Sequence, residues 1–159
     1  MLASDRFAST GSSHALDAGA RRGALVRIRH GAYATVDEWG AVDPGTRMLA
    51  AIDATRSAAR TGEPVFAYES AAAKHGIPLI GAWPSRAHVI TAHGGATSNA
   101  SVIRTRRMTP RESLVVLGDG AVVTSLITTA IDLAATRTPR GGLVAFDHLR
   151  FHRGVDVDE

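Results

Sequence analysis

The chain has 159 residues, 45% of them hydrophobic, which fits one domain or a small module joined to a modest core and excludes a disordered chain. It contains no cysteine, which excludes disulfides, thiolate metal sites and cysteine nucleophiles. No apolar run approaches the roughly 20 residues of a membrane-spanning helix, and no signal-peptide pattern opens the sequence. These features predict a cytoplasmic protein.

The charge is nearly balanced, but the basic residues are almost all arginine. The formal net charge is +3, and Lys74 is the only lysine. Arginine keeps its charge at any relevant pH and can bind phosphate or guanine through paired hydrogen bonds. GC-rich coding also produces an arginine-rich chain, so only the placement of the arginines can indicate a function. One basic cluster lies within residues 1–35, and a second consists of Arg104, Arg106, Arg107 and Arg111.

Residues 1–36 predict a small N-terminal unit that begins with helix. Residues 3–9 can form a short helix, and residues 12–22 have the polar cap and apolar spacing of another. Gly23 suits the left-handed position that follows a helix end. The second helix is therefore expected to stop there and turn into extended chain.

The next segment predicts a basic hairpin. In an alternating strand, Val26 and Ile28 fall on one face. Arg27 and Arg29 fall on the opposite face. The dipeptide His-Gly at residues 30–31 can close a tight turn. A polar helix followed by an arginine-edged hairpin is typical of a winged helix-turn-helix that binds DNA, and a plain surface hairpin is the alternative.

Residues 44–159 predict a mixed α/β domain with a mostly antiparallel sheet, reached through a connector at residues 35–45. Helices are expected over residues 46–60, 68–75, 124–135 and 140–153. Strands are expected over residues 87–91, 101–105, 114–117 and 121–123. The predicted fold class is α+β, a small winged helix-turn-helix followed by this domain.

Several polar groups have a catalytic or metal-binding interpretation that the sequence does not favour. His148 and His152 are four residues apart, as in zinc-binding helices, but no third ligand and no acidic residue between them accompany this spacing. The glycine-rich stretch at residues 93–96 lacks the ending of a P-loop. Ser70 and His75 are near in sequence only, which says little about their geometry. We predict no catalytic site, no metal and no cofactor.

Asp132 lies among apolar residues on the helix expected over residues 124–135. A carboxylate buried there needs a partner, which a nearby arginine or a backbone N–H can supply. A structural role is therefore favoured over a catalytic one.

Several segments, taken in order, resemble AbiEi-type antitoxins of actinobacterial kind. Residues 23–33, Gly-Ala-Leu-Val-Arg-Ile-Arg-His-Gly-Ala-Tyr, are similar to the end of the N-terminal winged helix of that family. Residues 70–79 resemble the segment that follows it, and residues 89–91 resemble the next strand. Residues 123–134 resemble the family's V-T-S … T-x-x-D-L-A helix. Order and spacing agree from about residue 11 to residue 150.

The resemblance implies a DNA-binding winged helix joined to an α/β antitoxin domain, in the antitoxin half of a type IV toxin–antitoxin system. Such an antitoxin represses its own operon, and its partner toxin is a nucleotidyltransferase. Thr128 stands where relatives often carry an arginine, so the salt bridge from that position to Asp132 is not expected. The similarity stops before the endonuclease-like domain into which many relatives continue.

We therefore predict a non-enzymatic DNA-binding regulator, an antitoxin-like repressor of its own operon. The expected partner is double-stranded DNA of its promoter, with a nucleotidyltransferase-type toxin and a second copy of the chain as further candidates. The alternative is a non-catalytic protein-interaction module, a remnant of a larger nuclease-like protein, marked by an exposed apolar patch. The candidate DNA contacts are Ser12, Ser13, His14, Arg21, Arg22, Arg27, Arg29, His30, Arg104, Arg106 and Arg107.

Overall fold

The structure is a computed structural model that describes residues 13–29, 31–60, 62–92 and 98–153. Its helices are α1 (Ser13–Arg21), α2 (Val36–Ala41), α3 (Pro44–Ser57), α4 (Tyr68–His75), α5 (Leu126–Thr136) and α6 (Pro139–Arg153). Its strands are β1 (Leu25–Arg29), β2 (Ala32–Thr35), β3 (Val65–Phe66), β4 (Ala87–Thr91), β5 (Val102–Arg106), β6 (Leu114–Val116) and β7 (Val122–Thr124). A 3₁₀ turn, η2 (Arg111–Ser113), precedes β6.

The strands form a two-stranded hairpin and a five-stranded sheet in the order β5-β4-β3-β7-β6. In the larger sheet, β4 and β5 run parallel, as do β3 and β7, whereas β3–β4 and β6–β7 are antiparallel. The hairpin adds one more antiparallel pair. The predicted α+β class is confirmed, and the large sheet is evenly divided between the two pairing modes.

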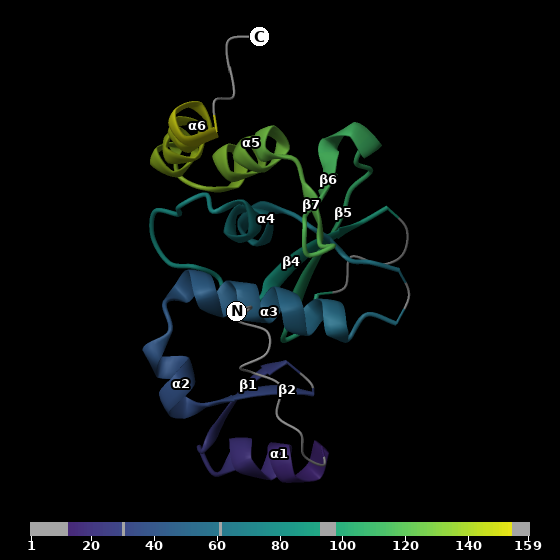
Figure 1. Cartoon of the computed structure of the whole chain (residues 1–159), viewed down its shortest axis with the longest axis vertical. Helices are drawn as coiled ribbons and strands as arrows, with labels where there is room; N and C mark the ends of the chain where they lie inside the picture. The colour runs from purple at the N-terminus through teal and green to yellow at the C-terminus, as the bar shows by residue number, and fades with distance from the viewer. Residues whose placement is uncertain (1–12, 30, 61, 93–97, 154–159) are drawn as a thin grey trace.

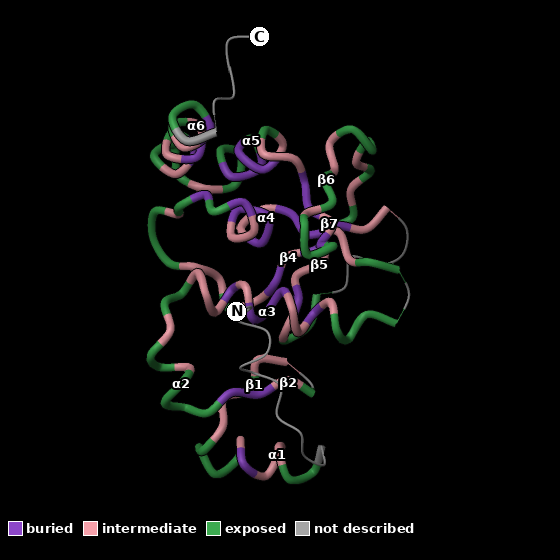
Figure 2. Tube along the Cα trace, in the orientation of Figure 1, coloured by how far each residue is buried: buried purple, intermediate pink, exposed green. Residues whose placement is uncertain are grey.

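The main core lies between this sheet and α3. Met48 and Ile52 of α3 pack with Phe66, Val89 and Val123 of the sheet. A second cluster joins α4, α5 and α6 on the other side of α4. Figure 2 shows the buried parts of the chain concentrated in the sheet, in α4 and on the facing sides of the helices around it. The order of the layers follows from which helix faces are apolar.

The N-terminal unit of α1, β1 and β2 forms one end of the molecule, and α6 lies at the opposite end (Figure 1). Gly23, with φ of +75°, ends α1 in the left-handed conformation predicted for it. The Tyr33 hydroxyl donates a hydrogen bond to the Asp17 carboxylate, which ties β2 to α1. Ile28 packs against the clusters that contain α3 residues, so the hairpin is attached to the rest of the fold.

The described chain before the hairpin contains one helix, α1, so a three-helix winged unit is not seen within residues 13–29. The helix expected over residues 3–9 lies outside the described residues. Two further helices, α2 and α3, come after the hairpin rather than before it. α3, the helix expected at residues 46–60, begins at Pro44, just after its Asp43 cap.

The prediction of a connector at residues 35–45 is wrong, because most of this segment forms helix α2. Thr35 is the N-cap: its hydroxyl oxygen accepts from the Glu38 backbone N–H at 3.3 Å, and the hydroxyl donates to the Glu38 carboxylate at 2.7 Å. The spacing Thr-x-x-Glu is a known helix-start signal. Helix α2 has six residues and none of them is buried, so the sequence shows no apolar periodicity there.

Candidate nucleic-acid interface

Helix α1 carries the first of the predicted contacts. Arg21 and Arg22 are exposed at its C-terminal end, and His14 is exposed near its start. Ser12 and His30 lie outside the described residues, as does the side chain of Ser13. Arg21 and Arg22 are therefore adjacent at the point where α1 ends and the chain turns into the hairpin.

The two arginines of β1 lie in different surroundings. The Arg27 side chain is 49% exposed, and its Nη1 lies 3.9 Å from the Asp17 carboxylate. A break in the strand register separates it from Arg29. Arg29 Nη1 donates to the Thr55 carbonyl oxygen at 3.3 Å, near the C-terminal end of α3. The irregularity breaks the simple alternation expected for this strand, so Arg29 turns toward the main domain.

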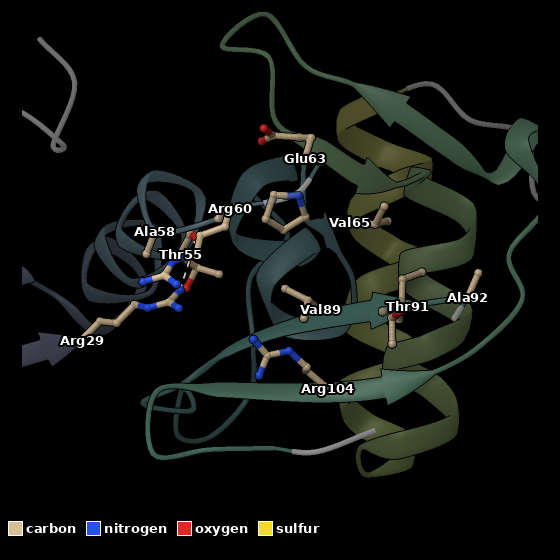
Figure 3. A pocket seen from close by; sticks show the side chains of 14 residues that line it. Arg29, Thr55, Ala58, Arg60, Glu63, Val65, Val89, Thr91, Ala92 and Arg104 are labelled. Atoms are coloured by element: carbon tan, nitrogen blue, oxygen red, sulfur yellow. Dashed lines mark hydrogen bonds between the residues drawn. The ribbon is translucent and has the colours of Figure 1, made fainter. Parts of the chain in front are cut away.

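Arg29 meets the second basic cluster at a cleft of about 450 Å³. Arg104 of β5 and Arg60, beyond α3, line the same cleft (Figure 3). Arg104 reaches it because β5 pairs with β4 in a register that sets Arg104 beside Val89. Burial, and then the charge of Arg104, lower the pKa of Arg29. One arginine from each basic cluster of the sequence thus lines the same concave surface.

The rest of the second cluster divides between surface and interior. Arg106 is exposed at the end of β5. Arg107 binds Asp132 of α5 through Nη1 at 2.5 Å and Nη2 at 3.0 Å. Its guanidinium also lies over the Tyr68 ring, 5.4 Å from the ring centroid. Arg107 is thus the partner that buried Asp132 requires. Both terminal nitrogens of the Arg107 guanidinium already bind a carboxylate inside the protein.

A polar network around Tyr68 has no counterpart in the sequence predictions. Tyr68 has a φ of +53°, unusual for a residue other than glycine, and its ring stacks on His88 at 4.2 Å. His88 is held by Thr105 Oγ1 at 2.7 Å. Glu69 accepts from Arg137 Nε at 2.9 Å. These groups come from α4, β4, β5 and the end of α5, so no local spacing could have revealed them.

The pKa of Glu69 reflects its position in this network. Burial alone would raise the pKa of this carboxyl, but hydrogen bonds from His88 and from the backbone, together with Arg137, lower it to about 2. Glu69 is therefore a stable carboxylate at neutral pH. The polar groups around Tyr68 bind one another. The network therefore holds strands β4 and β5 against α4 and the end of α5.

The residues considered for catalysis or metal binding are engaged elsewhere or separated. Ser70 is fully buried, and its hydroxyl oxygen accepts from the His88 backbone N–H at 2.8 Å. His75 Nε2 lies 2.7 Å from the Thr124 carbonyl oxygen. Across the described part of the chain, no group of three or more His, Asp or Glu residues is arranged to hold a metal ion. The side chain of His152, the expected neighbour of His148, is not among those described.

The exposed arginines are better suited to binding a polyanion than to forming a small catalytic site. Arg21, Arg22, Arg60 and Arg106 are exposed, and none of them forms an ion pair with another described residue. Each can therefore neutralise a phosphate without first breaking an internal bond. In contrast, Arg56, Arg107 and Arg137 are occupied by carboxylates.

No family model, curated protein or solved structure matches the chain. None of the helices within the described ranges is long and apolar enough to cross a bilayer.

Proposed function

We propose that this chain is a cytoplasmic, non-enzymatic DNA-binding regulator of the antitoxin type that represses its own operon. The observation that supports this most is the convergence of Arg29 and Arg104 on one cleft. Each comes from a different basic cluster of the sequence, and the cleft joins the hairpin to the sheet. Arginines gathered on one concave surface suit the DNA backbone, because phosphate contacts supply most of the sequence-independent affinity.

The proposed mechanism begins with neutralisation of phosphates along the hairpin. Arg21 and Arg22 stand at one end of β1, Arg27 lies in the strand, and Arg29 stands at the other end. A five-residue strand spans roughly 15 Å, so Arg21, Arg22 and Arg27 can reach neighbouring phosphates along the hairpin, while Arg29 meets a phosphate at the cleft that it lines. Helix α1 offers His14 to base edges from an exposed position. Phosphate contacts fix the docking, and base contacts supply specificity.

The test is the affinity for a duplex of the chain's own promoter, measured by fluorescence anisotropy at several salt concentrations. Each phosphate contact contributes about −0.9 to the slope of log affinity against log salt. We expect the double variants R21Q/R22Q and R27A/R29A each to weaken binding and flatten the slope by up to about 2. The matched control is R140Q, because Arg140 is exposed on α6 at the far end of the molecule. Affinity unchanged in both double variants, or reduced equally by R140Q, would reject the proposal.

A second candidate function, a protein-interaction module, is favoured by apolar side chains exposed on the C-terminal helices. On α5, Ile127 is 49% exposed and Ile131 is 53% exposed, one turn apart on the same face. Leu143 of α6 is 61% exposed. This candidate predicts self-association that the variant I127S/I131S abolishes, together with no salt-dependent affinity for DNA. Sedimentation velocity without DNA, beside the anisotropy titration, separates the two candidates.

A further inference from the structure

The cleft that Arg29 and Arg104 share is assembled from distant parts of the chain. The end of β1, the C-terminal end of α3 with the turn after it, and the adjoining strands β3, β4 and β5 all contribute to its wall. Its volume of about 450 Å³ lies within the range of small-molecule sites, which are roughly 300–1,000 Å³. Figure 3 shows the side chains of Arg29, Arg60 and Arg104 directed into this space.

The charged residues of the cleft are strongly unbalanced. Three of them are arginines, and the acidic one, Glu63, is bound by Arg56 through Nε at 2.5 Å. Two guanidiniums that share a partly buried space repel each other. An anion between them adds one attraction to each guanidinium and offsets this repulsion, so the cleft is better suited to an anionic ligand than to a neutral or cationic one.

The hydrogen-bonding capacity of Arg29 points to the same kind of ligand. A guanidinium has five N–H donors, and Arg29 donates one of them, on Nη1, to the Thr55 carbonyl oxygen at 3.3 Å. That bond holds the side chain in place and leaves other donors for a second acceptor. Guanidinium groups bind phosphate in a forked arrangement. A side chain that is already oriented loses less entropy when it binds.

We propose that this cleft is a phosphate-binding site in which Arg29 and Arg104 hold one phosphate group and Arg60 covers it from the exposed side. The inference deepens the proposed function and rests on it for the source of the phosphate, the backbone of duplex DNA. A free nucleotide carries the same group and is the other source of the phosphate. The two sources are distinguished by experiment.

The first experiment follows the Nε–Hε resonances of the arginines by NMR while inorganic phosphate is added to the full chain at constant ionic strength. We expect saturable shifts at Arg29 and Arg104. R104Q should weaken phosphate binding about tenfold or more, and R104K, which keeps the charge, should weaken it less. R140Q is the control and should bind as the wild type does. Shifts that do not saturate, or that spread equally to Arg140, overturn the inference.

The second experiment replaces phosphate with adenosine monophosphate in one arm and with a promoter duplex in the other. If the wild type binds the duplex and R104Q weakens that binding about tenfold, the phosphate comes from DNA. If only the nucleotide binds, the phosphate comes from a small effector. Should R104Q and R29Q keep wild-type duplex affinity while R21Q/R22Q loses it, the cleft inference fails and the proposed function stands. Should phosphate saturate the cleft while no duplex binds at any salt concentration, the proposed function fails and the cleft inference stands.

Discussion

The ion pair between Arg107 and Asp132 permits a sharp test of which arginines serve the fold. Its two N–O distances are 2.5 and 3.0 Å, and the side chains are 27% and 9% exposed. Removing one partner of a buried pair costs about 3–5 kcal/mol, because the other charge is left without compensation. The partial exposure of Arg107 lowers this figure, so we expect R107M or D132N to reduce the free energy of unfolding by about 2–3 kcal/mol.

The double variant R107M/D132N should lose less stability than the two single variants added together. A coupling energy of about 1–2 kcal/mol is expected, since each single change already removes the same interaction. Urea unfolding followed by circular dichroism measures these differences, and the single variants should also lower Tm by about 4–12 °C. The control is R106M, since Arg106 is exposed and forms no ion pair with another described residue. Single effects that simply add, or an R107M variant as stable as R106M, would refute the assignment of Arg107 to the fold.

Three further predictions concern the fold. In G142A, the new Cβ would lie 2.9 Å from the Cα of Ala134, so thermal unfolding should show a loss of about 1–2 kcal/mol in the free energy of unfolding. The control is G40A, whose new Cβ meets nothing within 4 Å, and this variant should be neutral or slightly stabilising. In S125A, the α5 N-cap loses the Ser125 side chain that accepts from the Thr128 N–H, and urea unfolding should show a loss of about 1 kcal/mol. Folding lowers the pKa of Glu69 from 4.5 to about 2, so the ionised carboxylate adds up to about 3 kcal/mol to the free energy of unfolding. This contribution is complete above pH 4.5 and is lost as the pH falls toward 2. Acid unfolding of E69Q should therefore be less steep over that interval, and a profile parallel to that of the wild type would contradict the role assigned to Glu69.

Burial on α5 shows why composition is a weak guide to the interior of this chain. Taken as whole residues, Asp132 is 7% exposed, whereas the neighbouring Ile131 is 53% exposed. The face of α5 that carries Ala130 and Leu133 packs against α4 and α6, and Asp132 is held on the inner side by Arg107. The position of a helical residue around the axis, rather than its hydropathy, decides whether it is buried. The presence of a partner for Asp132 could be expected, but its identity could not.

Local features of the sequence were enough to find most helices and strands. Gly23 marks the end of α1, Ser125 marks the start of α5, and alternating apolar residues mark β4 and β5. These signals depend on residues a few positions apart, and short-range backbone sterics and hydrogen bonds produce them. The two-residue strand β3 is too short to show alternation, yet it lies at the centre of the sheet.

The meeting of Arg29 with Arg104, like that of Arg107 with Asp132, depends on which strands become neighbours. The order β5-β4-β3-β7-β6 brings β5 beside β4, and the packing of Ile28 against α3 brings the end of β1 to the same cleft. Many strand orders satisfy the same local patterns, and only the burial of the shared core selects among them. The sequence by itself therefore determined that the protein carries arginine-rich basic clusters. Which arginines face the cleft and which hold the interior together was decided by the way the sheet and its helices bury their apolar faces.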